Sequence, residues 1–177
     1  MAVHAFVDES ARCGQFLLCA TFVEPAQLSP TRRALKTLLL PGARELHFKK
    51  EKTPRRRILI DQMARMAVSS RLYVGSCGRK SEEETRQRCL AQAVQDLLTV
   101  QAHRLVLDTR GHRDVLDRRT LQRALGLRPS KTELTYEHLD STAEPLLWIS
   151  DAVAWCFGAG GDWRRRAVPL IAECTEV

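Results

Sequence analysis

The fold is decided by a stretch near the start of the chain that reads Val3-His4-Ala5-Phe6-Val7-Asp8-Glu9-Ser10. Its apolar residues are typical of a β-strand, and the strand pattern ends in two adjacent carboxylates. Because successive side chains of a strand point to opposite faces of a sheet, Asp8 shares the face of Phe6, and Glu9 shares that of Val7. Only one of the two acids can therefore face a given cleft. Solvated turn residues are the alternative interpretation of this pair.

Two later segments also place an acid beside apolar residues. Leu105-Val106-Leu107-Asp108 repeats the strand pattern, and Asp151 lies inside an apolar helical segment at 149–153. Sites in open α/β sheets gather at the carboxyl ends of strands, so Asp8 and Asp108 are expected to meet there. An ionised acid on an apolar helical stripe is costly to bury unless a cation or a hydrogen-bond donor meets it. Asp8, Asp108 and Asp151 are therefore predicted to form one site.

Three clustered carboxylates predict a metal centre. Their charges repel one another, and a divalent cation removes that penalty. Oxygen-only ligands favour Mg²⁺ or Mn²⁺ over zinc. A pair of such ions about 4 Å apart activates a water molecule and stabilises the leaving oxygen when a phosphodiester is cleaved. The predicted chemistry is hydrolysis of nucleic-acid phosphodiester bonds without a covalent nucleophile.

The composition is ordinary except for its charge. The chain has 177 residues, of which 44% are hydrophobic and 28% charged, and its net charge is +7. This length suits one domain over 1–177, and the positive charge favours a polyanionic partner such as RNA or DNA. The six cysteines lack metal-ligand spacing, so we interpret them as reduced residues of a cytoplasmic protein. No run approaches the roughly 18 apolar residues that a membrane span needs.

The predicted elements fit an α/β protein whose mixed sheet has helices on both faces. Strands are expected at 3–9, 16–23, 71–77, 103–108 and 134–139, and the first two should form an antiparallel hairpin. Helices are expected at about 30–40, from 53 onward, and at 81–101, 113–125 and 143–158. Residues 160–177 are predicted to be a basic C-terminal tail. Its Trp163 and following arginines could contact nucleic acid, or the segment could be frayed and solvated.

A polar segment after the first helix carries further candidates, and it reads Glu45-Leu46-His47-Phe48-Lys49-Lys50-Glu51-Lys52. His47 could act as a general base or proton shuttle, although an isolated histidine is more often a surface or core residue. If this segment borders the acidic cleft, phosphates would be held by its basic run, which comprises Lys49, Lys50, Lys52, Arg55 and Arg56. A solvated helix start is the alternative, since basic charge opposes the dipole there.

The order of these motifs resembles the family called domain of unknown function 3800, whose members look like ribonuclease-H-like nucleases. The matching segments are 6–10, 45–47, 106–108, Ser141 and 146–153. The resemblance implies a ribonuclease-H-like mixed five-stranded sheet, with Asp8, Asp108 and Asp151 at the positions that bind metal. Glu45 or Glu9 would supply a fourth carboxylate. The chain departs from the family pattern at Ser150, where alanine is usual, and in a shorter loop at 11–14.

The sequence thus predicts a nuclease that depends on Mg²⁺ or Mn²⁺ and cleaves RNA or DNA. The competing hypothesis belongs to a different functional class. It is a catalytically inactive module that keeps the fold and binds nucleic acid or another protein. The two hypotheses differ in whether the carboxylates converge and bind metal.

Overall fold

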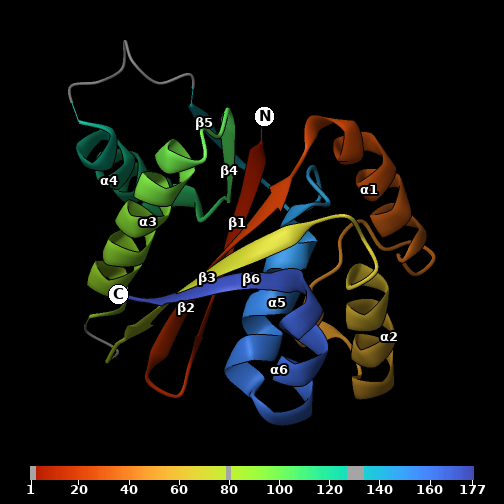
Figure 1. The fold of residues 1–177 in the computed structure, drawn as a ribbon. Coiled ribbons are helices and arrows are strands. Elements are labelled where there is room, and N and C mark those ends of the chain that lie inside the picture. The colour runs from red at the N-terminus through yellow and green to blue at the C-terminus, as the bar shows by residue number, and fades with distance from the viewer. Residues whose placement is uncertain (1–2, 79–80, 127–133) are drawn as a thin grey trace.

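A computed structural model of the chain describes residues 3–78, 81–126 and 134–177. One mixed sheet runs through it in the strand order β5-β4-β1-β2-β3-β6 (Figure 1). The strands are β1 (His4–Arg12), β2 (Gln15–Val23), β3 (Ser69–Ser76), β4 (Arg104–Asp108), β5 (Thr135–Leu139) and β6 (Ile171–Glu176). β1, β2 and β3 form antiparallel neighbours, whereas β1–β4, β4–β5 and β3–β6 are parallel pairs. The predicted mixed sheet and first hairpin are confirmed.

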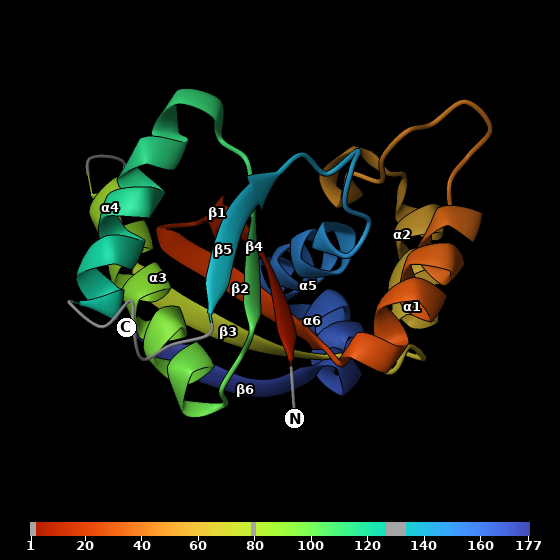
Figure 2. The ribbon, with the colours of Figure 1, turned by 90° about the horizontal axis from the view of Figure 1, so that it is seen from above.

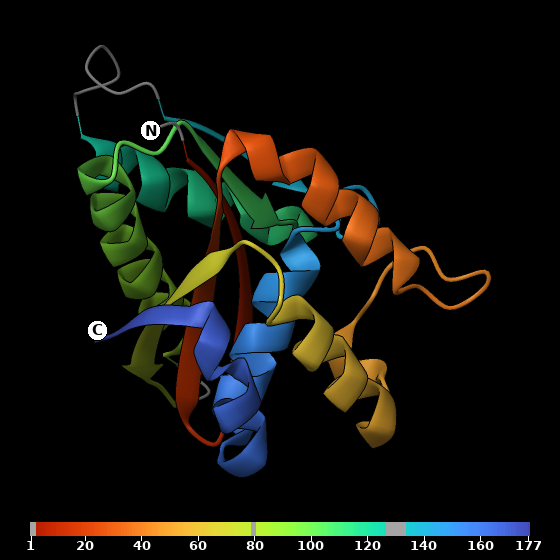
Figure 3. The same cartoon turned by 45° about the vertical axis from the view of Figure 1, so that its right-hand side comes forward.

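Helices cover both faces of the sheet, as predicted (Figure 2). One face carries α3 (Glu82–Thr99) and α4 (Asp114–Leu125). The other carries α1 (Pro25–Thr37), α2 (Thr53–Met63), α5 (Leu147–Ala159) and α6 (Gly161–Ala167), which Figure 3 shows together on one side. Three short 3₁₀ turns complete the described chain: η1 (Phe48–Lys50), η2 (Gly111–Arg113) and η3 (Val168–Leu170). No helix of these described segments is long and apolar enough to cross a bilayer.

The alternation of β1 divides the apolar residues into two cores. Phe6 belongs to the core under α5, together with Leu17 and Trp148. Val7 belongs to the core under α3, together with Leu105. Because side chains alternate along a strand, Asp8 continues the α5 face, and the residue after it continues the α3 face. The pleat therefore assigns the two adjacent acids to different sides of the sheet.

Two predicted boundaries were wrong near the N-terminus. β1 does not end at its acids, because pairing with β2 continues to Arg12 opposite Gln15. Asp8 therefore lies in the middle of a strand. α1 begins at Pro25 rather than near residue 30, because Pro25 takes the first helical turn, where its missing amide hydrogen costs nothing. Pro30 lies inside α1, where it removes one backbone hydrogen bond.

The predicted C-terminal tail was also wrong. Residues in this region form α6, η3 and β6, and β6 pairs in parallel with β3 at the edge of the sheet. The sheet consequently has six strands where the resemblance implied five. Ala167 and Leu170 are buried in the core under α5, which fixes the segment against the rest of the fold. Most side chains of β6 are exposed, so its sequence lacks the alternation that would have predicted a strand.

Candidate active site

Asp8 and Asp108 lie side by side because β1 and β4 are neighbouring parallel strands. The register pairs Val7 with Leu107, so the next residue of each strand is the acid. Asp8 shares the face of Phe6, and the same alternation directs Asp108 toward α5. The prediction that two strands bring their acids to one edge of a cleft therefore agrees with the register.

Asp151 reaches the same place from α5. Its side chain is buried, and its Oδ2 accepts a hydrogen bond of 2.8 Å from the backbone N–H of Phe48. The Nδ1 atom of His47 lies 3.1 Å from the same oxygen. Both partners come from η1 and the residue before it, so this turn fixes the orientation of the carboxylate.

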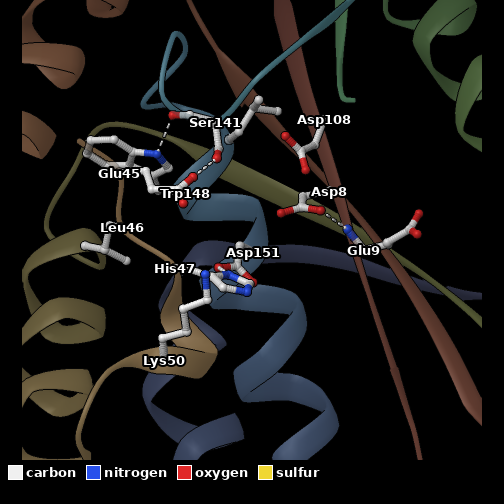
Figure 4. A pocket seen from close by; sticks show the side chains of 11 residues that line it. Asp8, Glu9, Glu45, Leu46, His47, Lys50, Asp108, Ser141, Trp148 and Asp151 are labelled. Atoms are coloured by element: carbon white, nitrogen blue, oxygen red, sulfur yellow. Dashed lines mark hydrogen bonds and ion pairs between the residues drawn. The ribbon is translucent and has the colours of Figure 1, made fainter. Parts of the chain in front are cut away.

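Asp8, Asp108 and Asp151 line one cavity of about 250 Å³ (Figure 4). Every predicted catalytic residue lines it, and the full lining is Asp8, Glu9, Glu45, Leu46, His47, Lys50, Asp108, Ser141, Leu147, Trp148 and Asp151. Figure 4 shows Asp8, Asp108 and Asp151 directed toward a common centre. Residues that the sequence separates by up to 143 positions therefore line one pocket.

The two candidates for a fourth carboxylate differ in their surroundings. Glu9 points away from the other acids (Figure 4) and forms an ion pair with Arg86 of α3. Glu45 accepts a hydrogen bond from the Ser141 hydroxyl, and the Ser141 carbonyl accepts one of 2.8 Å from Trp148 Nε1. The geometry therefore favours Glu45 over Glu9 as a fourth acid of the pocket.

The electrostatics of the pocket favour a bound cation. Burial raises the pKa of Asp8 well above its usual value, and the charges of Asp151 and Asp108 raise it further. Burial likewise raises the pKa of Asp108 to about 6, with neighbouring acids adding to the effect. The hydrogen bond to Asp151 raises the pKa of His47. Burial and mutual repulsion disfavour the ionised form of these carboxylates, and a bound divalent cation would stabilise that form.

The carboxylates of Asp8, Asp108 and Asp151 are farther apart than the ligands of a single ion. Among the described residues, the only three acidic, histidine or cysteine ligand atoms that all lie within 4.8 Å of one another belong to Asp114, Asp117 and His138. Oxygens bound to one small cation lie closer together than this, because each is about 2.1 Å from the ion. Carboxylates that share a pair of ions about 3.5–4 Å apart can be spread more widely. The spacing of the three carboxylates is therefore compatible with a pair of ions.

The compact cluster of Asp114, Asp117 and His138 is better explained as an ion-pair network. Arg86 donates two hydrogen bonds, of 3.0 and 2.8 Å, to the carboxylate of Asp117. Arg110 donates a third, of 2.8 Å. Despite burial, hydrogen bonds from His138 and Arg86 hold the pKa of Asp117 below its usual value. Two guanidinium groups already neutralise this acid and would repel a metal ion, so we interpret the cluster as structural.

The predicted basic run contributes one residue to the pocket. Lys50 lines it, whereas Lys49 and Lys52 are exposed outside it. Arg55 forms an ion pair with Glu51, which precedes its helix, and Arg56 donates to two backbone carbonyls. Part of this run therefore holds the polypeptide together, and only part is available to a ligand.

A buried hydroxyl cluster that the sequence did not predict includes Ser150, the residue before Asp151. Ser150 Oγ donates a hydrogen bond of 2.7 Å to the carbonyl of Phe6, and it lies 2.7 Å from Thr21 Oγ1. Thr21 Oγ1 is in turn 3.0 Å from Ser70 Oγ. These contacts tie α5 to β1, β2 and β3 beside Asp151. The departure from alanine at Ser150 thus has a structural role, which only the packed sheet reveals.

The architecture is similar to a known fold. A chain in the structure of the PCNA:RNase HII complex from Archaeoglobus fulgidus superposes with a TM-score of 0.52 and 15% sequence identity, covering 88% of this chain and 70% of that chain. The fold is ribonuclease-H-like. No protein-family model matches the sequence, and no curated protein matches it. Identity this low extends to the fold alone, so the resemblance to domain of unknown function 3800 stays a prediction.

The raised pKa of Asp108 predicts that the metal-free protein loses stability as pH rises from about 4 through about 6. The folded state holds this proton more tightly than the unfolded state, whose Asp pKa is about 3.9, so ionisation in this window favours unfolding. Because Asp108 is partly exposed, we expect an effect of about 1–2 kcal/mol. Urea unfolding with EDTA at pH 4–8 should show a flatter profile for Asp108→Asn. Glu24→Gln, at an exposed position, should keep the wild-type profile.

Proposed function

We propose that the protein is a divalent-metal-dependent nuclease that hydrolyses phosphodiester bonds of RNA or DNA. The observation that carries the proposal is the convergence of Asp8, Asp108 and Asp151, from β1, β4 and α5, on one pocket. The net charge of +7 supports a polyanionic substrate. The ribonuclease-H-like fold is compatible with this activity, but the site residues carry the argument.

The donor set suits Mg²⁺ or Mn²⁺. All the candidate ligands are carboxylate oxygens, which these ions prefer over softer donors. Burial and mutual repulsion of Asp8 and Asp108 create the deficit of positive charge that a cation would fill. When bound, a pair of such ions supplies an activated water and stabilises the leaving oxygen.

The side chains have distinct proposed roles. Asp8 and its neighbour Asp108 would hold the metal together with Asp151, which the Phe48 N–H keeps in place. His47 bonds to Asp151 through Nδ1, which leaves Nε2 as the atom that exchanges a proton with the leaving oxygen. Lys50 would hold a phosphate at the mouth of the pocket. Membership of domain of unknown function 3800 and a cytoplasmic location are part of the same proposal.

Metal binding to the folded protein is the first test. Mn²⁺ or Mg²⁺ added to EDTA-treated protein should raise its melting temperature, because a ligand at 100 times its Kd stabilises the native state by about 2.7 kcal/mol. Asp8→Asn should lose this shift, and Glu24→Gln should keep it. A folded wild-type protein that shows no shift with either ion would contradict the metal-dependent nuclease. Nucleic-acid binding without a shift or cleavage would favour the inactive module.

A further inference from the structure

A surface of aromatic and basic side chains begins one helical turn beyond the pocket. Trp155 follows Asp151 by four residues in α5, so the two side chains share one face of the helix, about 6 Å apart along its axis. Trp155 is only partly buried. The guanidinium carbon of Arg56 lies 4.4 Å from its ring centroid, and that of Arg12 lies 5.6 Å away. We call these three residues the Trp155 platform.

Contacts with the η1 turn and with Trp163 hold the Trp155 platform in place. Arg56 donates hydrogen bonds to the carbonyls of Phe48, at 2.9 Å, and Lys49, at 2.6 Å. The Trp155 ring packs against Phe48, with centroids 5.4 Å apart, and meets Trp163 edge to face at 5.5 Å. The same turn that orients Asp151 therefore also supports the platform. A ligand on the platform would be positioned relative to the pocket without rearrangement of the backbone.

Arg12 supplies a charge that the described protein does not neutralise. It is exposed at the end of β1, and within the described segments no carboxylate forms an ion pair with it. Its stem lies against α5, because a Cβ built on Gly158 would be 3.9 Å from the Arg12 Cβ. The extension of β1 beyond Asp8 thus places this cation beside Trp155. A phosphate bound by Arg12 would therefore lie beside the partly exposed Trp155 ring.

We infer that the Trp155 platform binds an unpaired stretch of the nucleic acid whose backbone enters the pocket, an inference that rests on the proposed nuclease function. The guanidinium group of Arg12 takes a phosphate, and the part of the Trp155 ring that is not covered takes a base. Arg56, which is bonded to two backbone carbonyls, holds the ring in place. In a duplex both faces of a base are covered by its neighbours, so stacking on Trp155 selects single-stranded segments. The nucleic-acid contact considered for Trp163 is assigned to Trp155 instead, because Trp163 packs against Trp155 at nearly a right angle.

The test is equilibrium binding in EDTA, where binding does not depend on cleavage. A fluorescein-labelled oligothymidylate of about 12 nucleotides, within the range of known single-strand site sizes, is titrated with protein and followed by anisotropy. Trp155→Leu should weaken binding by about 5-fold or more. Trp155→Phe should weaken it less, and it replaces the leucine variant if that one fails to fold. A blunt duplex of equal length should bind more weakly than the single strand.

Arg12→Ala tests the proposed phosphate contact. The Arg12 side chain is exposed, so its removal leaves the core intact. Losing one phosphate contact should lower the slope of log Kobs against log salt concentration by about 0.7, the value for single strands. Arg119→Ala, on α4 and the opposite face of the sheet, removes the same charge and should leave the slope unchanged. Equal affinity for the duplex, an unchanged slope in Arg12→Ala, or displacement by poly-glutamate as effective as by DNA would overturn the inference.

The outcomes separate this inference from the proposed function. A protein that binds the oligonucleotide through Arg12 and Trp155 but cleaves nothing with Mn²⁺ would refute the nuclease and leave the platform standing. Cleavage that depends on Asp8, together with wild-type single-strand affinity in Trp155→Phe, Trp155→Leu and Arg12→Ala, would refute the platform and leave the nuclease. Both readouts use the full chain.

Discussion

Asp8→Asn is expected to lower the rate of metal-dependent cleavage by at least about 100-fold. The substitution keeps the size of the side chain but removes the charge from the acid that lies between Asp108 and Asp151 in the pocket. A metal site contributes several kcal/mol to the stabilisation of charge in the transition state, and each 1.4 kcal/mol corresponds to a factor of ten in rate. The measurement is cleavage of end-labelled RNA, DNA and RNA–DNA hybrid oligonucleotides with Mn²⁺, resolved on denaturing gels.

Two controls make this result specific to the pocket. The folded state of Asp8→Asn should be at least as stable as that of the wild type without metal, since the substitution removes a buried charge that its neighbours repel. Glu24→Gln removes an acid at an exposed position outside the pocket and should cleave at the wild-type rate. Equal activity in wild type and Asp8→Asn would assign the cleavage to another site or to a contaminating enzyme.

The predictable part of the site follows from the period of two in a β-strand. Alternation alone placed Asp8 with Phe6 and apart from Glu9, and the structure has the two acids on opposite faces. An acid on the apolar helix α5 had to meet a partner, and the Phe48 N–H and His47 provide it. Such predictions succeed because local periodicity and the cost of burying a charge need no knowledge of tertiary contacts.

The unpredicted features depend on contacts between segments far apart in sequence. β6 shows no alternation, so only its pairing with β3 defines it as a strand. Arg86 looks like a solvated helix residue in a polar sequence, yet it is buried against Asp117 of a different helix. Ser150 looks like a small substitution in an apolar motif, but its hydroxyl joins a cluster across three strands. Contacts between side chains from distant segments can be identified only in the folded structure.

Asp117→Asn is expected to destabilise the protein by about 3–5 kcal/mol, the usual cost of removing one partner of a buried ion pair. The Asp117 side chain is 1% exposed and that of Arg86 is 3% exposed, so the substitution leaves a buried guanidinium without its main partner. Urea unfolding at pH 7 measures the loss. Asp61→Asn breaks an ion pair with Arg166 in which both partners are substantially exposed, and it should cost at most about 1 kcal/mol.

The contribution of Asp117 to stability changes with pH in the opposite direction to that of Asp108. Because the pKa of Asp117 is lowered in the folded state, its contribution is present above the unfolded pKa of about 3.9 and is lost as pH falls below it. A wild-type protein and an Asp117→Asn variant should therefore differ most at neutral pH and converge in acid. A difference of less than about 1 kcal/mol at pH 7 would contradict the buried network.

The same variant distinguishes an ion-pair network from a metal centre. If Asp114, Asp117 and His138 held an ion, Asp117→Asn would lower the number of Mn²⁺ ions bound, and EDTA would destabilise the wild type as much as the substitution does. Because Arg86 and Arg110 already occupy the Asp117 carboxylate, we expect Asp117→Asn to keep the wild-type Mn²⁺ stoichiometry while losing stability. Asp8→Asn should lose Mn²⁺ binding while remaining stable, so the two substitutions separate the acid that binds metal from the acid that supports the fold.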